Sequence, residues 1–179
     1  VGEMGIGNST AAAAVCARGL GGDVRDWAGP GTGLDSAGIA RKVAVIEQAL
    51  AKHADAPRTA FETLRRLGGR EIAAIAGAVL AARHARVPVM LDGFIACAAL
   101  APLVADQPAL AEHCLAGHCS AEPGHRRLLH QFNLTPLLQL GMRLGEGSGA
   151  AVAVPIVRAA LATHNGMATF AEASVSGKL

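Results

Sequence analysis

Apolar positions along the chain recur mainly at helical spacing. Ile39, Val43, Ile46 and Leu50 fall three or four residues apart, which predicts a strong helix from Asp35 or Ser36 to about residue 53. The same pattern, with its breaks at Gly and Pro, predicts further helices over 8–20, from Pro57 to near Gly68, from there to about Arg86, over 94–105, around 124–132, over 148–163 and, briefly, after Met167.

Two short runs are apolar without helical periodicity. VPVML at 87–91 and the segment 113–119 predict buried strands. Strands that alternate with helices predict an α/β fold, a Rossmann-like parallel sheet with flanking helices, in one domain over 1–179. Ligands bind such sheets beyond the carboxyl ends of the strands. The loops of interest are therefore 2–8, 29–34, 92–94, 117–123 and 145–149.

Composition narrows the classes of function. The 179 residues are 51% hydrophobic and 17% charged, so the chain should fold, and with 3% aromatics and no Tyr its core must be Ala, Val, Leu and Ile. A net charge of +2 without a basic block argues against nucleic acid. Asp92, Gly93 and two prolines interrupt the longest apolar stretch, 87–104, so we expect no membrane span. Four cysteines without a secretory signal favour reduced thiols and a cytoplasmic location.

The motif GEMGIGNST at 2–10 combines glycines with the start of a helix. Glycines allow a close approach to a ligand, and free N–H groups at the helix start favour a phosphate. Asn8, Ser9 and Thr10 are all suitable N-caps. Glu3 would repel a phosphate and fits better beside a ribose or a base. The alternative is an ordinary tight turn, and the spacing does not decide between the two.

Two further loops carry candidate binding groups. GPGTGLDS at 29–36 forms a shaped loop before a helix in which Lys42 could reach a phosphate, although a lone Lys is more often solvated. Asp92 follows a buried strand, where a carboxylate is costly unless it is paired. It could bind a ligand hydroxyl, or it could cap the helix that begins near Phe94.

The segment 112–130 is rich in His and Cys and invites a zinc interpretation. His113 and Cys114, like His118 and Cys119, are neighbours in sequence, and neighbours on a strand point to opposite faces. We therefore expect no metal there and interpret SAEPGH at 120–125 as a ligand loop that enters a helix.

In GMRLGEGSGA at 141–150, Glu146 lies between two glycines just before a helix. A general base needs such exposure to its substrate, and an apolar ring packed on the carboxylate would raise its pKa. A helix cap or a surface Glu is the open alternative.

Together and in this order, GEMGIGNST, GPGTGLDS, DGFI, GHCSAEPGH and LGEGSGA resemble the nicotinate-nucleotide:dimethylbenzimidazole phosphoribosyltransferases, with Ser in place of Thr at 9 and 148. The resemblance covers essentially the whole chain, which corresponds to the C-terminal half of the longer family chain. Because the chain starts at Val1 inside a motif, we expect the N-terminal part to be absent.

The resemblance implies that a benzimidazole nitrogen displaces nicotinate from nicotinate mononucleotide, giving the α-ribazole 5′-phosphate used in the cobalamin nucleotide loop. It implies Glu146 as the base and Glu3 near the reacting ribose. It also implies a homodimer, a small helical domain to which the C-terminal helices contribute, and no cofactor or metal. The implied substrate-binding residues are Gly5, Asn8, Gly31, Thr32, Gly33, Lys42, Asp92, Gly93 and Ser120 around the nucleotide and Leu144 at the benzimidazole.

Two other hypotheses stay open at this point. A non-catalytic nucleotide-binding α/β module would use the same Gly-rich loops, but Glu146 would be idle. A structural or metal-binding fragment would be centred on the His and Cys residues.

Overall fold

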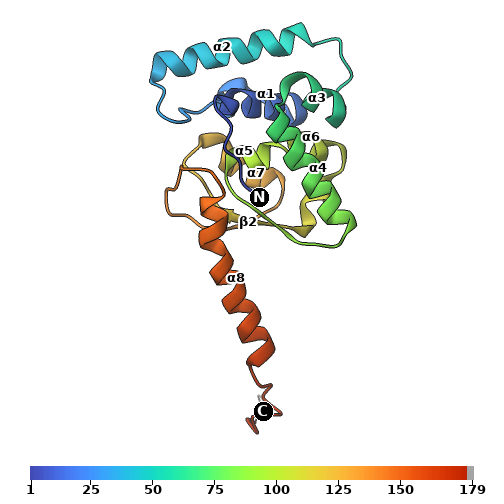
Figure 1. The fold of residues 1–179 in the computed structure, drawn as a ribbon, viewed down its shortest axis with the longest axis vertical. Helices are drawn as coiled ribbons and strands as arrows, with labels where there is room; N and C mark the ends of the chain where they lie inside the picture. The colour runs from blue at the N-terminus through green and yellow to red at the C-terminus, as the bar shows by residue number, and fades with distance from the viewer. Residues whose placement is uncertain (177–179) are drawn as a thin grey trace.

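A three-stranded parallel sheet lies at the centre of the computed structural model, which describes residues 1–176 (Figure 1). The strands are β1 (Val89–Leu91), β2 (Cys114–His118) and β3 (Pro136–Leu138), in the order β1-β2-β3. Val89 pairs with Cys114, and Ala116 pairs with Pro136. The α/β fold with a parallel sheet and flanking helices is thus confirmed.

The helices lie above and around this sheet, as Figure 1 shows. The outermost, α2, lies across α1 at one end of the molecule, and α8 runs away from the sheet to the opposite end. The helix bounds are α1 Asn8–Leu20, α2 Ser36–Lys52, α3 Ala60–Leu67, α4 Arg70–His84, α5 Phe94–Ala98, α6 Ala101–Asp106, α7 Pro123–Gln131 and α8 Ser148–Gly166, with 3₁₀ turns η1 Val24–Asp26 and η2 Pro108–His113.

Small side chains allow the helices to pack closely around α1. Its residues Ala12–Ala17 are all buried, and the helix contacts α2, α3, α5 and α6. A Cβ at Gly19 would lie 3.0 Å from the backbone of Pro102 on α6, so only glycine fits comfortably at this crossing. The aliphatic core expected from composition is present, and Trp27, Phe94 and Phe132 supply its buried aromatic rings.

Several expected boundaries were wrong. The predicted helix over 94–105 is two helices, because the chain breaks at Ala99–Leu100 and restarts just before Pro102. The strand β3 was not predicted, and Pro136 is tolerated at its start because β3 lies at the edge of the sheet. Within the described residues, a turn over 170–174 follows α8 instead of a short helix.

Two helix starts also differ from the prediction. α1 begins after Gly7 in the left-handed conformation, with no side-chain cap from Asn8, Ser9 or Thr10. α3 begins three residues after Pro57, with Thr59 as its N-cap.

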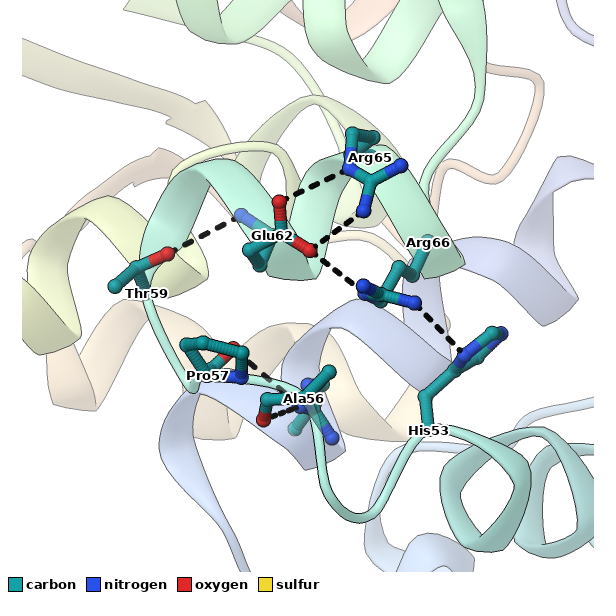
Figure 2. A network of polar contacts seen from close by, with 8 residues as sticks. His53, Ala56, Pro57, Thr59, Glu62, Arg65 and Arg66 are labelled. Atoms are coloured by element: carbon teal, nitrogen blue, oxygen red, sulfur yellow. Dashed lines mark hydrogen bonds and ion pairs between the residues drawn. The ribbon is translucent and has the colours of Figure 1, made fainter.

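A buried arginine joins α1 to the loop before α3, whose residues Ala56 and Pro57 Figure 2 shows beside the Glu62 cluster. Arg18 is 3% exposed and donates from Nη2 to the carbonyl oxygens of Ala56, at 2.6 Å, and Pro57, at 3.4 Å. Beside it, Glu62 accepts from Arg66 at 2.7 Å, and bonds from arginines hold the pKa of that carboxyl at about 2. Exposed ion pairs contribute little to stability, so we attribute the fixed position of the loop at Ala56 and Pro57 to the bonds from the buried Arg18.

No helix within residues 1–176 is both long enough and apolar enough to cross a bilayer.

Candidate active site

A cavity of about 250 Å³ opens at the carboxyl ends of β1 and β2. The loops 3–9, 31–32, 92–96, 118–122 and 143–146 surround it, which is the position that a parallel sheet gives to a ligand. Most of the predicted site residues line it, namely Glu3, Gly5, Asn8, Gly31, Thr32, Asp92, Gly93, Ser120, Leu144 and Glu146. Gly33 and Lys42 lie outside the lining.

The two candidate catalytic carboxylates stand on segments that run side by side. The Glu146 N–H donates to the Glu3 carbonyl oxygen at 3.0 Å, and the Asp92 N–H donates to the Val1 carbonyl oxygen at 3.0 Å. Glu146 has a φ of 61°, which is rare for a residue with a side chain, and it is exposed. The loop therefore presents the Glu146 carboxylate to the cavity.

Glu3 closes its own turn. Its carboxylate accepts from the Gly5 N–H at 2.8 Å and from the Asn8 side-chain amide. The Gly5 N–H is thus occupied by a carboxylate and is not free for a phosphate.

Lys42 holds a loop instead of standing in solvent, so the expectation of a solvated Lys42 was wrong. Its side chain is buried, and Nζ donates to the Gly29 carbonyl oxygen at 2.7 Å and to Ser9 Oγ at 3.0 Å. Burial lowers the pKa of Lys42, and the nearby Glu122 opposes that shift. Glu122 in turn accepts from the Gly31 N–H at 2.7 Å. Both ends of the 29–31 loop are therefore fixed beside the cavity.

Asp92 caps a helix, but a different one from that expected. Its carboxylate accepts from the Gly147 N–H at 3.1 Å and from the Ala150 N–H at 2.9 Å, in the first turn of α8. It makes no such bond to α5, whose N-cap is Gly93 without a side-chain bond. The side chain is 2% exposed, and the helix N-terminus compensates for its buried charge.

Two buried histidines lie beneath the cavity, with their rings 6.0 Å apart. The Nδ1 atom of His125 accepts from the Ser120 N–H at 2.9 Å, and its Nε2 lies 3.3 Å from Cys97 Sγ. Burial and, to a smaller extent, His118 lower the pKa of His125 to about 3. His125 therefore stays neutral and fixes the Ser120 loop.

This shift makes stability depend on pH. Between pH 6.5 and about 3 the unfolded chain binds a proton at residue 125 that the folded chain does not, so stability is complete above pH 6.5 and falls on acidification. We expect a loss of roughly 1 kcal/mol per pH unit in this window, measured by denaturant unfolding at pH 7, 6 and 5. His125→Asn, which keeps an acceptor near Nδ1, should reduce the slope. His130→Gln, on the exposed face of the same helix, is the control and should leave the slope unchanged. An equal slope in wild type and both variants would show that His125 is not the source of the pH dependence.

The cysteines and histidines do not gather around a common point. Among the described residues, no three His, Cys, Asp or Glu side chains could hold one metal ion. All four cysteines are buried free thiols. Burial raises the pKa of the Cys114 thiol to about 11 and that of Cys97 well above its ordinary value, so both are poor nucleophiles.

Sequence reasoning missed several residues at the cavity. His118 was considered only as a metal ligand, and Glu122 and Arg143 were not singled out, although all three line the cavity. Each lies inside a quoted motif, so the signal was present in GHCSAEPGH and GMRLGEGSGA. Exposed apolar side chains, Met4, Ile6 and Leu144, also line the cavity.

With this geometry in view, comparison with known proteins identifies the family. A family model described as phosphoribosyltransferase matches residues 1–175, and the chain belongs to this phosphoribosyltransferase family.

Curated relatives share one name, nicotinate-nucleotide–dimethylbenzimidazole phosphoribosyltransferase. The protein of that name from Novosphingobium aromaticivorans is 74% identical over 100% of this chain and 53% of its own length. That from Rhizobium etli is 59% identical over 99% of this chain and 53% of its own length. The chain thus spans about half the length of the curated relatives it matches.

A solved structure agrees with the sequence relatives. The crystal structure of CobT from Thermus thermophilus superposes with a TM-score of 0.92 at 44% identity. The match covers 99% of this chain and 53% of that one.

Proposed function

We propose that this chain carries the catalytic and nucleotide-binding loops of an enzyme that transfers phosphoribose from nicotinate mononucleotide to 5,6-dimethylbenzimidazole. The products are α-ribazole 5′-phosphate and nicotinate, and the first serves assembly of the cobalamin nucleotide loop. The observation that carries the proposal is that Glu3 and Glu146 line the same cavity at the ends of the strands. A relative that bears the name of this activity is 74% identical to the chain.

The chemistry needs one base and little else. A benzimidazole nitrogen attacks the anomeric carbon of the ribose, the bond to the nicotinate nitrogen breaks, and its electron pair neutralises the positive ring. The attacking ring must lose its N–H proton, and the exposed Glu146 carboxylate takes it. Glu3, fixed by Gly5 and Asn8, lies toward the ribose, whose developing positive charge a carboxylate stabilises.

The cavity lining suits the two substrates. Met4, Ile6 and Leu144 offer apolar surface to a benzimidazole ring. Arg143 supplies a cation for the anionic nucleotide, and the loop at Gly31 and Thr32 borders the nucleotide side, with Gly33 next along the chain. Lys42 acts on a phosphate through the loop that it fixes, or directly after a change of its bonds to Ser9 and Gly29.

The surface of α8 supports two further parts of the proposal, a helical domain and a homodimer. It projects from the sheet (Figure 1) and exposes Val152, Ile156 and Leu161. Such apolar positions suit a helix that packs in a separate helical domain or against a second copy of the protein. The helical domain, the homodimer and the cytoplasmic location stay predictions.

The test is release of nicotinate from nicotinate mononucleotide in the presence of 5,6-dimethylbenzimidazole. It is run with this chain and with a chimera in which the chain follows the preceding segment of the 74% identical relative. We expect release by the chimera that requires both substrates. If nicotinate mononucleotide binds but neither protein releases nicotinate, the proposed enzymatic activity is contradicted. A non-catalytic nucleotide-binding module is then favoured.

A further inference from the structure

The strand ends bring an unpartnered histidine beside the capping carboxylate. β1 ends at Leu91, which pairs with Ala116 of the parallel β2, so Asp92 and His118 both lie just past this pair at the same edge. His118 is 1% exposed and lines the cavity. Neither of its ring nitrogens has a hydrogen-bond partner in residues 1–176. A buried polar group without a partner is costly, so its retention at a cavity needs a reason.

The ring also lies directly against the first turn of α8. A Cβ at Gly149 would stand 2.1 Å from Cδ2 and 2.5 Å from Nε2 of His118, so only glycine leaves room for the ring. Nε2 is 3.6 Å from Oδ1 of Asp92, which is too long for a hydrogen bond. The same Oδ1 accepts from the Ala150 N–H at 2.9 Å.

We propose that His118 is a positioning residue, a role that rests on the proposed function. When nucleotide is bound, the Nε2–H of His118 donates to the Asp92 carboxylate. This bond fixes the start of α8 and thereby the position of Glu146. The path is short, because Asp92 holds the N–H of Gly147, the residue after Glu146. Functional hydrogen bonds are often long without substrate and shorten when it binds. Burial lowers the pKa of His118 despite the opposing effect of Asp92, so the ring is a neutral donor with one N–H.

Three substitutions separate this role from simple filling of space. His118→Gln places an N–H near the position of Nε2, whereas His118→Asn places one near Nδ1 and His118→Leu supplies none. In the chimera, we expect kcat to fall about tenfold for Asn and Leu, the equivalent of one lost hydrogen bond, and to stay within about threefold of wild type for Gln. KM for nicotinate mononucleotide should change less than kcat in all three.

Gly149→Ala is the second variant, because it displaces the ring without altering the His118 side chain. We expect the same loss of kcat as in His118→Leu. His130→Gln, exposed on α7, is the matched control and should behave as wild type. Equal kcat in the Gln, Asn and Leu variants would overturn the proposal.

A second readout does not depend on turnover. Amide hydrogen exchange of Gly147 and Ala150 is followed by NMR in this chain, with and without nicotinate mononucleotide. We expect the nucleotide to slow exchange of both amides in wild type and His118→Gln, but not in His118→Leu. Slowed exchange without any nicotinate release would contradict the proposed function but would still support the positioning role of His118. No change in exchange, or the same change in the Leu variant, would overturn the positioning role even where release is normal.

Discussion

Glu146→Gln should lower nicotinate release by about a hundredfold or more, because the amide cannot accept the proton of the attacking benzimidazole. The substitution is nearly isosteric, and this loop is held through its backbone N–H groups: that of Glu146 donates to the Glu3 carbonyl oxygen and that of Gly147 to the Asp92 carboxylate. Folding and binding of nicotinate mononucleotide should therefore persist. Release is measured in the chimera, and binding is measured by calorimetry in parallel.

Glu112→Gln is the control for this prediction, since Glu112 is exposed, outside the cavity lining and loses the same charge. Full activity in Glu112→Gln beside the loss in Glu146→Gln assigns the effect to position 146. Unchanged release in Glu146→Gln would reject Glu146 as the base, while membership of the family would stand.

Gly2→Ala should lower release by about tenfold or more and also lower the thermal midpoint, since overpacking against backbone costs about 1–3 kcal/mol. A Cβ at Gly2 would lie 2.2 Å from the Gly147 nitrogen and 2.4 Å from its Cα, and backbone atoms cannot move aside as a flexible side chain does. The two segments must separate, which breaks the bond between Glu3 and Glu146.

Gly77→Ala is a close match as a control. Gly77 lies exposed in α4, and a Cβ there would meet no atom within 4 Å, so alanine should leave stability equal or raise it by about 0.4–1 kcal/mol. The chimera is assayed with each substitution, and unfolding is followed by circular dichroism. A Gly2→Ala protein with the midpoint and release of wild type would show that the two segments tolerate separation.

The sequence predicted the parts of the fold that depend on local pattern. The helix capped by Asp35 begins where the periodicity of Ile39, Val43 and Ile46 placed it, because neighbouring residues determine both features. β3 escaped prediction because three residues that begin with a proline carry almost no periodicity, and pairing with β2 alone makes them a strand.

The site was predictable in its members but less so in their bonds. Motifs identified the residues around the cavity, since loops that follow strands meet at one edge of the sheet. The partners came from far along the chain: Lys42 is buried against Gly29 and Ser9, and Asp92 caps a helix that begins only at Ser148. Local sequence cannot specify such bonds, because Lys42 could equally be solvated and Asp92 could equally cap the nearby helix that begins at Phe94.

The cap that β1 supplies to α8 has a consequence for folding. α8 extends outward from the sheet, and its own N-cap, Gly147, has no side chain to accept from the first amides. Its acceptor arrives only when Asp92 is in place at the end of β1, which requires closure of a long loop. The first turn of α8 is therefore coupled to the end of β1, so a local opening that releases Asp92 also removes the acceptor of the Gly147 and Ala150 amides beside Glu146.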